Sequence, residues 1–106
     1  MKVLLIINDP PYWTERVYNA LRLAQGLAKK NPAAEIAVFL MADAVLVAKA
    51  AQKTPDGFYN IERMLKRVLA GNGRVLLCGT CMDGTRRSSM DELTTATVEA
   101  DKVLVY

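Results

Sequence analysis

The stretch Arg74-Val75-Leu76-Leu77-Cys78-Gly79-Thr80-Cys81-Met82-Asp83 joins a short apolar run to both cysteines of the chain. The run predicts a buried parallel strand from Arg74 to Leu77, and the small polar residues after it predict a loop at the carboxyl end of that strand. In open α/β sheets, ligands and chemistry are found at this edge. The central question is therefore what a Cys-x-x-Cys pair does there.

Other apolar runs predict the remaining strands of the same sheet. Lys2 to Ile7 is continuously apolar after its first residue, as strands buried on both faces are, and we expect it to be a central strand. Glu35 to Leu40 predicts a second strand, and Lys102 to Tyr106 predicts the last one.

Helices are predicted between these strands from apolar residues at three-and-four spacing. The first is expected from about Thr14, as N-cap, to Lys30, with its buried face formed by Val17, Ala20, Leu21, Ala24, Leu27 and Ala28. The second is expected from about Asp43 to Gln52. The third is expected from about Asn60 to Ala70, with a core stripe of Ile61, Met64, Leu65, Val68 and Leu69.

Two helix ends carry specific signals. Gly71-Asn72-Gly73 follows the third helix and predicts a left-handed C-cap. Ser89-Met90-Asp91-Glu92 matches a capping box and predicts a last helix from about Ser89 to Ala100. Alternating strands and helices predict an α/β fold with a mainly parallel sheet and helices on both faces, formed by one domain over residues 1–106.

Composition narrows the possible functions. The net charge is +3, but basic and acidic residues are interleaved, which indicates a solvated surface and not a nucleic-acid interface. Hydrophobic residues make up 52% of the chain, and we read this surplus as a sign of self-association. The apolar run Val3 to Ile7 is too short for a signal peptide or a membrane span, so we expect a cytoplasmic protein without a membrane contact.

The chain contains no histidine. This excludes Ser-His-Asp and Cys-His catalysis and His-containing zinc sites, unless a partner chain supplies the residue. Two thiols alone do not complete a zinc site, which would then need ligands from a second subunit. We therefore expect neither a metal nor a cofactor.

The cysteine pair has several interpretations. Cys78 continues an apolar strand and is equally explained as a small, inert core residue. Backbone amides at the carboxyl end of a strand, together with Arg86 and Arg87, favour a reactive thiolate, while the nearby acids, Asp83 among them, oppose it. The spacing to Cys81 also matches dithiol redox motifs, although no proline flanks the pair.

Several stretches together resemble the DsrE/DsrF-like family of small sulfur-relay proteins. They are Leu77 to Asp83 followed shortly by arginines, Val3 to Pro11, Phe39 to Val45, and Gln52 to Ile61. The resemblance implies a three-layer αβα sandwich of the DsrEFH-like type, with a Rossmann-like, mainly parallel sheet of four to five strands. It also implies assembly into oligomers, here most simply homo-oligomers. The loop after Cys81 is shorter than is usual in the Cys-x-x-Cys branch of this family.

The resemblance also implies an activity and a site. Cys78 matches the cysteine that carries sulfane sulfur as a persulfide, and Cys81 matches the second thiol of the Cys-x-x-Cys branch. Sulfur donor and acceptor proteins would be the partners of such a carrier or sulfurtransferase. We expect the substrate to be bound by residues around this loop, namely Asn8, Asp9, Gly79, Thr80 and Arg86. A dithiol redox protein and a non-catalytic oligomeric binding module are the alternatives.

Overall fold

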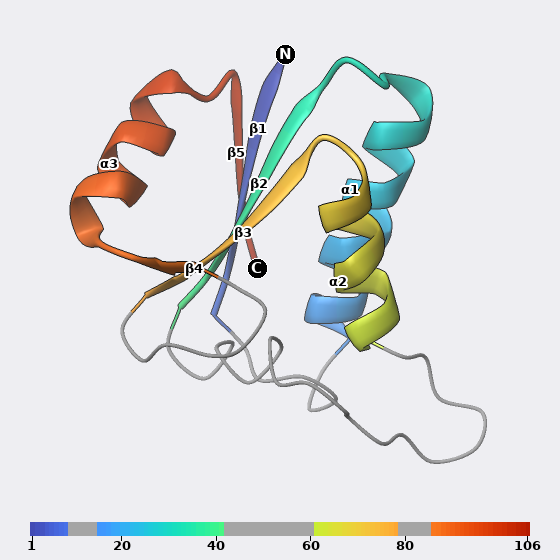
Figure 1. Cartoon of the computed structure of the whole chain (residues 1–106), viewed down its shortest axis with the longest axis horizontal. Coiled ribbons are helices and arrows are strands. Elements are labelled where there is room, and N and C mark those ends of the chain that lie inside the picture. Colours follow the sequence, from blue (N-terminus) through green and yellow to red (C-terminus); the bar gives the residue numbers. More distant parts are fainter. Residues whose placement is uncertain (9–14, 42–60, 79–85) are drawn as a thin grey trace.

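The computed structural model describes residues 1–8, 15–41, 61–78 and 86–106. This part of the chain forms five strands and three helices (Figure 1). In chain order they are β1 (Lys2–Ile7), α1 (Arg16–Lys30), β2 (Glu35–Leu40), α2 (Ile61–Ala70), β3 (Gly73–Cys78), β4 (Arg86–Ser88), α3 (Met90–Glu99) and β5 (Lys102–Val105). The second predicted helix, from about Asp43 to Gln52, lies outside the described residues.

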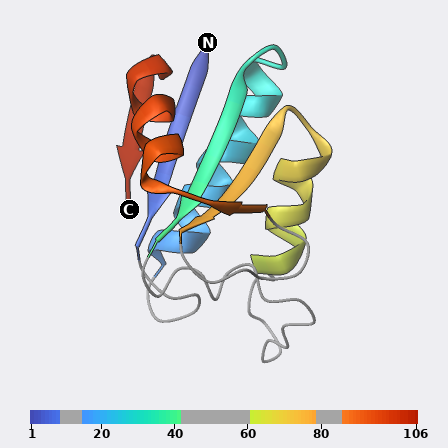
Figure 2. The ribbon, with the colours of Figure 1, turned by 60° about the vertical axis from the view of Figure 1, so that its left-hand side comes forward.

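The five strands form one sheet in the order β4-β3-β2-β1-β5, and every pairing is parallel. Helices α1 and α2 cover one face, and α3 lies on the other (Figures 1 and 2). The predicted α/β fold with helices on both faces is therefore confirmed. The first strand lies inside the sheet, as its apolar sequence predicts, although the middle position belongs to β2.

The larger part of the core lies between the sheet and the α1/α2 layer. Alternate residues of the three inner strands point into it because side chains along a strand alternate between faces. They meet the apolar stripes of the two helices, and the core includes Leu5, Ile7, Val38, Leu40, Leu77, Val17, Leu21, Met64, Leu65 and Val68. One prediction in α2 is wrong. Leu69 is 41% exposed, since it lies one residue beyond Val68 and so about 100° further around the helix.

A smaller core lies under α3 on the opposite face. It combines four strand residues with two helix residues, and consists of Leu4, Ala37, Phe39, Leu76, Leu93 and Ala96. Residues on β1, β2 and β3 are therefore buried on both faces of the sheet.

The helix starts agree only partly with the predictions. Helix α1 begins at Arg16, and its N-cap is Glu15, which makes no capping hydrogen bond through its side chain. The predicted cap at Thr14, which lies outside the described residues, is therefore wrong. At α3 the prediction is confirmed, because Ser89 Oγ accepts a hydrogen bond from the backbone N–H of Glu92 at 3.2 Å.

The sequence did not predict strand β4, because residues 86–88 have no strand pattern and follow the cysteine loop directly. It pairs with the end of β3, placing Arg86 opposite Leu76 and Ser88 opposite Cys78. A strand of three residues with two arginines carries no apolar pattern, and only its backbone pairing defines it. Charged residues are usual on such edge strands.

The turn between α2 and β3 differs from the predicted C-cap. Neither Gly71 nor Gly73 has a backbone φ in the left-handed region. Gly73 is instead required by close packing, because a Cβ there would overlap the carbonyl oxygen and Cγ1 of Val68. At Gly71 the nearest atoms to such a Cβ are 3.9 Å away, which is ordinary contact.

We predict that Gly73→Ala lowers the free energy of unfolding by about 2 kcal/mol, because α2 and β3 must separate to admit the methyl group. Gly71→Ala is the matched control. It should leave stability unchanged or raise it by about 0.5 kcal/mol, since it restricts only the unfolded chain. Urea unfolding followed by circular dichroism measures both, and equal stabilities of the two variants would contradict the prediction.

Candidate functional site

The carboxyl ends of the inner strands meet at one edge of the sheet. The parallel register aligns Ile7 of β1 with Leu40 of β2, and Leu40 with Leu77 of β3. Cys78 is the last residue of β3 and therefore lies at this edge. Asn8 follows β1 at the same edge, as the sequence predicted.

Asn8 is, however, tied to β5 and not to β3. Its backbone N–H donates to the carbonyl oxygen of Tyr106 at 2.9 Å, and its side-chain Nδ2 donates to the same oxygen at 3.2 Å. Strand β2 separates β1 from β3, so the backbones of Asn8 and Cys78 are about two strand spacings, roughly 10 Å, apart. The described contacts of Asn8 are thus structural, and its role in binding substrate stays a prediction.

Arg86 is closer to the cysteine strand. It is the first residue of β4, next to β3, and its backbone is opposite Leu76, two residues before Cys78. The other predicted site residues, Asp9, Gly79, Thr80 and Cys81, lie outside the described residues.

Ser88 is the residue that the structure adds to the predicted site. It is the register partner of Cys78 on the adjacent parallel strand. Its hydroxyl oxygen is buried, and it has no hydrogen-bond partner in the described part of the chain. Burying a hydroxyl without a partner costs about 1–3 kcal/mol, so such a group in a native structure calls for an explanation.

Helix α3 begins directly behind Ser88, with Ser89 as its N-cap. The positive end of the helix dipole is therefore near the cysteine edge, but Asp91 and Glu92 in the first turn oppose it. A hydrogen bond to a charged group contributes about 1.5–3 kcal/mol, against about 0.3–1 kcal/mol for a helix end. The Ser88 hydroxyl is accordingly the stronger candidate for stabilising an anion at this edge.

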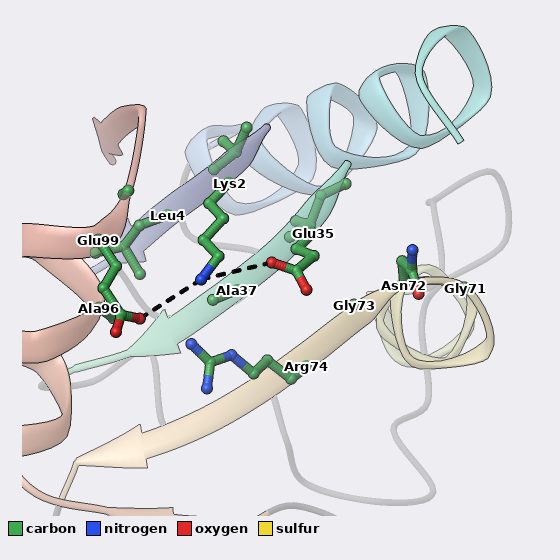
Figure 3. Close-up of a pocket in the computed structure, with 13 residues that line it drawn as sticks. Lys2, Leu4, Glu35, Ala37, Gly71, Asn72, Gly73, Arg74, Ala96 and Glu99 are labelled. Carbon is green, nitrogen blue, oxygen red and sulfur yellow. Dashed lines mark ion pairs between the residues drawn. The ribbon is translucent and has the colours of Figure 1, made fainter. Parts of the chain in front are cut away.

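A hollow of about 450 Å³ lies at the opposite, amino edge of the sheet (Figure 3). Lys2 bridges two acids there, since its Nζ is 3.8 Å from Oε2 of Glu35 and 3.8 Å from Oε2 of Glu99. Arg74 reaches into the hollow from β3 (Figure 3). No sequence motif predicted this hollow, although charged residues at the first positions of several strands are a signal for it.

This hollow is separate from the cysteine edge. Each inner strand has six residues and so spans about 20 Å between the two edges. The ion pairs of Lys2 are half-exposed, and such pairs contribute at most about 1 kcal/mol each. They order the rim of the hollow more than they stabilise the fold.

No three side chains among the described His, Cys, Asp and Glu residues come together as ligands of a metal ion would. Within the same residues, no helix is both long and apolar enough to cross a membrane.

Comparisons with known proteins agree along the whole chain. The family model of the DsrE/DsrF-like family matches residues 1–106. Protein YchN of Escherichia coli is 37% identical, with 99% of this chain and 98% of that protein aligned. An uncharacterized protein of Methanocaldococcus jannaschii, MJ0989, is 31% identical over the full length of both chains.

The fold comparison gives the same result. The crystal structure of the ychN protein from E. coli superposes with a TM-score of 0.91 at 34% sequence identity, and it covers 100% of this chain and 99% of that chain. The α/β fold of this chain is thus shared with that structure over the full length of the chain. The chain belongs to the DsrE/DsrF-like family.

Proposed function

We propose that the protein, acting as a single domain of residues 1–106, is a sulfur carrier or sulfurtransferase that holds sulfane sulfur as a persulfide on Cys78. The observation that carries the proposal is the place of Cys78, at the carboxyl end of β3 and in backbone register with Ser88, whose buried hydroxyl has no hydrogen-bond partner among the described residues. Membership of a family of the sulfur-relay type supports it.

The loading step requires a thiolate and a donor persulfide. The Cys78 thiolate attacks the outer sulfur of the donor, the S–S bond of the donor breaks, and the donor leaves as a thiolate. The electron count is balanced without an outside oxidant, and no general-base histidine is needed, because thiol exchange depends on thiolate content and access. The chain, which has no histidine, is compatible with this chemistry.

Cys81 offers a second step. Its thiolate attacks Sγ of the Cys78 persulfide, hydrosulfide leaves, and a Cys78–Cys81 disulfide remains. The two electrons that reduce the sulfane sulfur come from the two thiols. Gly79 and Thr80 between the cysteines give the chain freedom to close this ring. Arg86, Asn8 and Asp9 remain the proposed binding residues around the loop.

A carrier of this kind works with partner proteins. We propose sulfur donor and acceptor proteins, a homo-oligomeric assembly and a cytoplasmic setting, in which thiols are kept reduced. Exposed apolar side chains on α3 and β5, namely Met90, Val98, Val103 and Val105, support the assembly. A monomeric mass in light scattering would remove this part of the proposal.

A dithiol redox protein is the second candidate, favoured by the Cys-x-x-Cys spacing. It predicts a reversible disulfide and no stable persulfide. A non-catalytic binding module predicts instead that both thiols alkylate no faster than a free model thiol.

We expect the reduced protein to gain the mass of one sulfur atom on exposure to a persulfide donor. The gain should persist in Cys81→Ser and disappear in Cys78→Ser, because only Cys78 accepts sulfur. Intact-mass spectrometry of the three proteins, with and without reductant, measures this. Loss of two hydrogens in the wild type with no gain of sulfur in any of the three proteins, Cys81→Ser included, would support the dithiol protein, and an unchanged mass in all three would support the binding module.

We also expect Ser88→Ala to shift the pH midpoint of Cys78 alkylation upward by about one unit, since a hydrogen bond from a hydroxyl favours the thiolate. The measurement uses a Cys81→Ser background, in which Cys78 is the only thiol. Thr94→Ala is the control, because its Oγ1 donates to the carbonyl oxygen of Met90 within α3. An equal midpoint in Ser88→Ala and Thr94→Ala would assign Ser88 a structural role only.

A further inference from the structure

We propose that a cavity between α1 and α2 binds a small organic carboxylate with an apolar body. The cavity has a volume of about 230 Å³ and lies on the face of the sheet opposite α3. It is bounded by the last turns of both helices and by the turn at residues 71–73, which Figure 3 shows between α2 and β3. It is thus remote from Cys78 and does not depend on the proposed sulfur chemistry.

Small side chains leave this space open. Ala24 and Ala28, one helical turn apart on α1, face the cavity, and Val68 of α2 lines the other side. Gly73 adds no side chain, and its backbone lies so close to Val68 that there is no room for one. The walls are therefore apolar and fixed by packing.

One residue that lines this space has a buried polar atom without a hydrogen-bond partner among the described residues. The side-chain Nε2 of Gln25 is buried, and no described residue accepts a hydrogen bond from it. Gln25 lines the cavity, so a ligand with an acceptor oxygen would satisfy the amide.

The charges around the cavity favour an anion. Arg67 lines the cavity and makes no ion pair within the described part of the chain. Lys29 and Lys30 lie in the last turn of α1, and the sequence of that helix contains no acidic residue. The carboxyl ends of the two helices each lower the affinity for an anion by about two- to fivefold. A charged hydrogen bond from arginine raises the affinity by about ten- to hundredfold, so the net effect favours an anion.

The volume sets the size of the apolar body. An apolar cavity of about 150 Å³ accepts benzene, so 230 Å³ admits a body somewhat larger than that, such as a six-carbon chain. The carboxylate would accept hydrogen bonds from Gln25 and Arg67, and the chain would contact Ala24, Ala28 and Val68.

The test is a titration of the ¹⁵N-labelled protein with hexanoate, followed through the side-chain amide signal of Gln25. We expect a saturable shift of this signal. Hexan-1-ol has the same chain without the charge and should bind about tenfold more weakly, and hexylamine should not shift the signal. No shift with hexanoate would overturn the proposal and leave a cavity that holds water only, and equal binding of hexan-1-ol would overturn carboxylate recognition.

Substitutions distinguish a loss of hexanoate recognition from a loss of stability. Arg67→Gln should weaken hexanoate binding by about tenfold, while Lys102→Gln, on β5 away from the cavity, should leave it unchanged. Gln25→Leu is followed through the backbone amide signal of Gly73, which also lines the cavity. It should abolish binding but keep or raise the midpoint of thermal unfolding, because it removes an amide that has no partner among the described residues. Unchanged binding in Arg67→Gln, or equal losses in Arg67→Gln and Lys102→Gln, would overturn the site.

Discussion

The parallel pairing of β1, β2 and β3, with apolar side chains on both faces, is the constraint on which this structure depends. A one-residue slip would move residues such as Phe39 and Leu76 from one core to the other, so the register is firmly specified. Once the register is fixed, the carboxyl ends of the strands must meet at one edge. That edge is where the chain places Cys78, and the helices act as covers that keep the strands buried.

Most of the fold was predictable because buried strands and helix faces appear in the sequence as apolar runs or as regularly spaced apolar residues. β1 and β2 have the predicted bounds, and β3 extends the predicted strand by one residue at each end. The failures occur where backbone geometry decides. Strand β4 exists through its ladder to β3, Gly73 is demanded by contact with Val68, and the start of α1 carries no side-chain cap. None of these leaves a pattern in the residues themselves.

In the candidate site, too, some positions were predictable from the sequence and others were not. Cys78 was predictable because it ends an apolar run, and Asn8 because it follows another. Their separation was not predictable, since the strand order that inserts β2 between them is a tertiary property. The position of Ser88 beside Cys78 was also not predictable, because it follows from strand pairing across the sheet. The cavity at Gln25 arises from alanines that in sequence read only as good helix formers.

The short length of β4 affects how much the segment behind Cys78 can vary in length. Adjacent parallel strands usually need a crossover of a dozen or more residues. Here β4 pairs with only the last three positions of β3, so seven residues, 79–85, suffice to join them. Both anchors of this segment lie on neighbouring strands, and doubling the length of a closed loop costs only about 0.6 kcal/mol of entropy. Insertions and deletions behind Cys78 therefore cost the fold little free energy, so the length of this segment can change while the scaffold is kept.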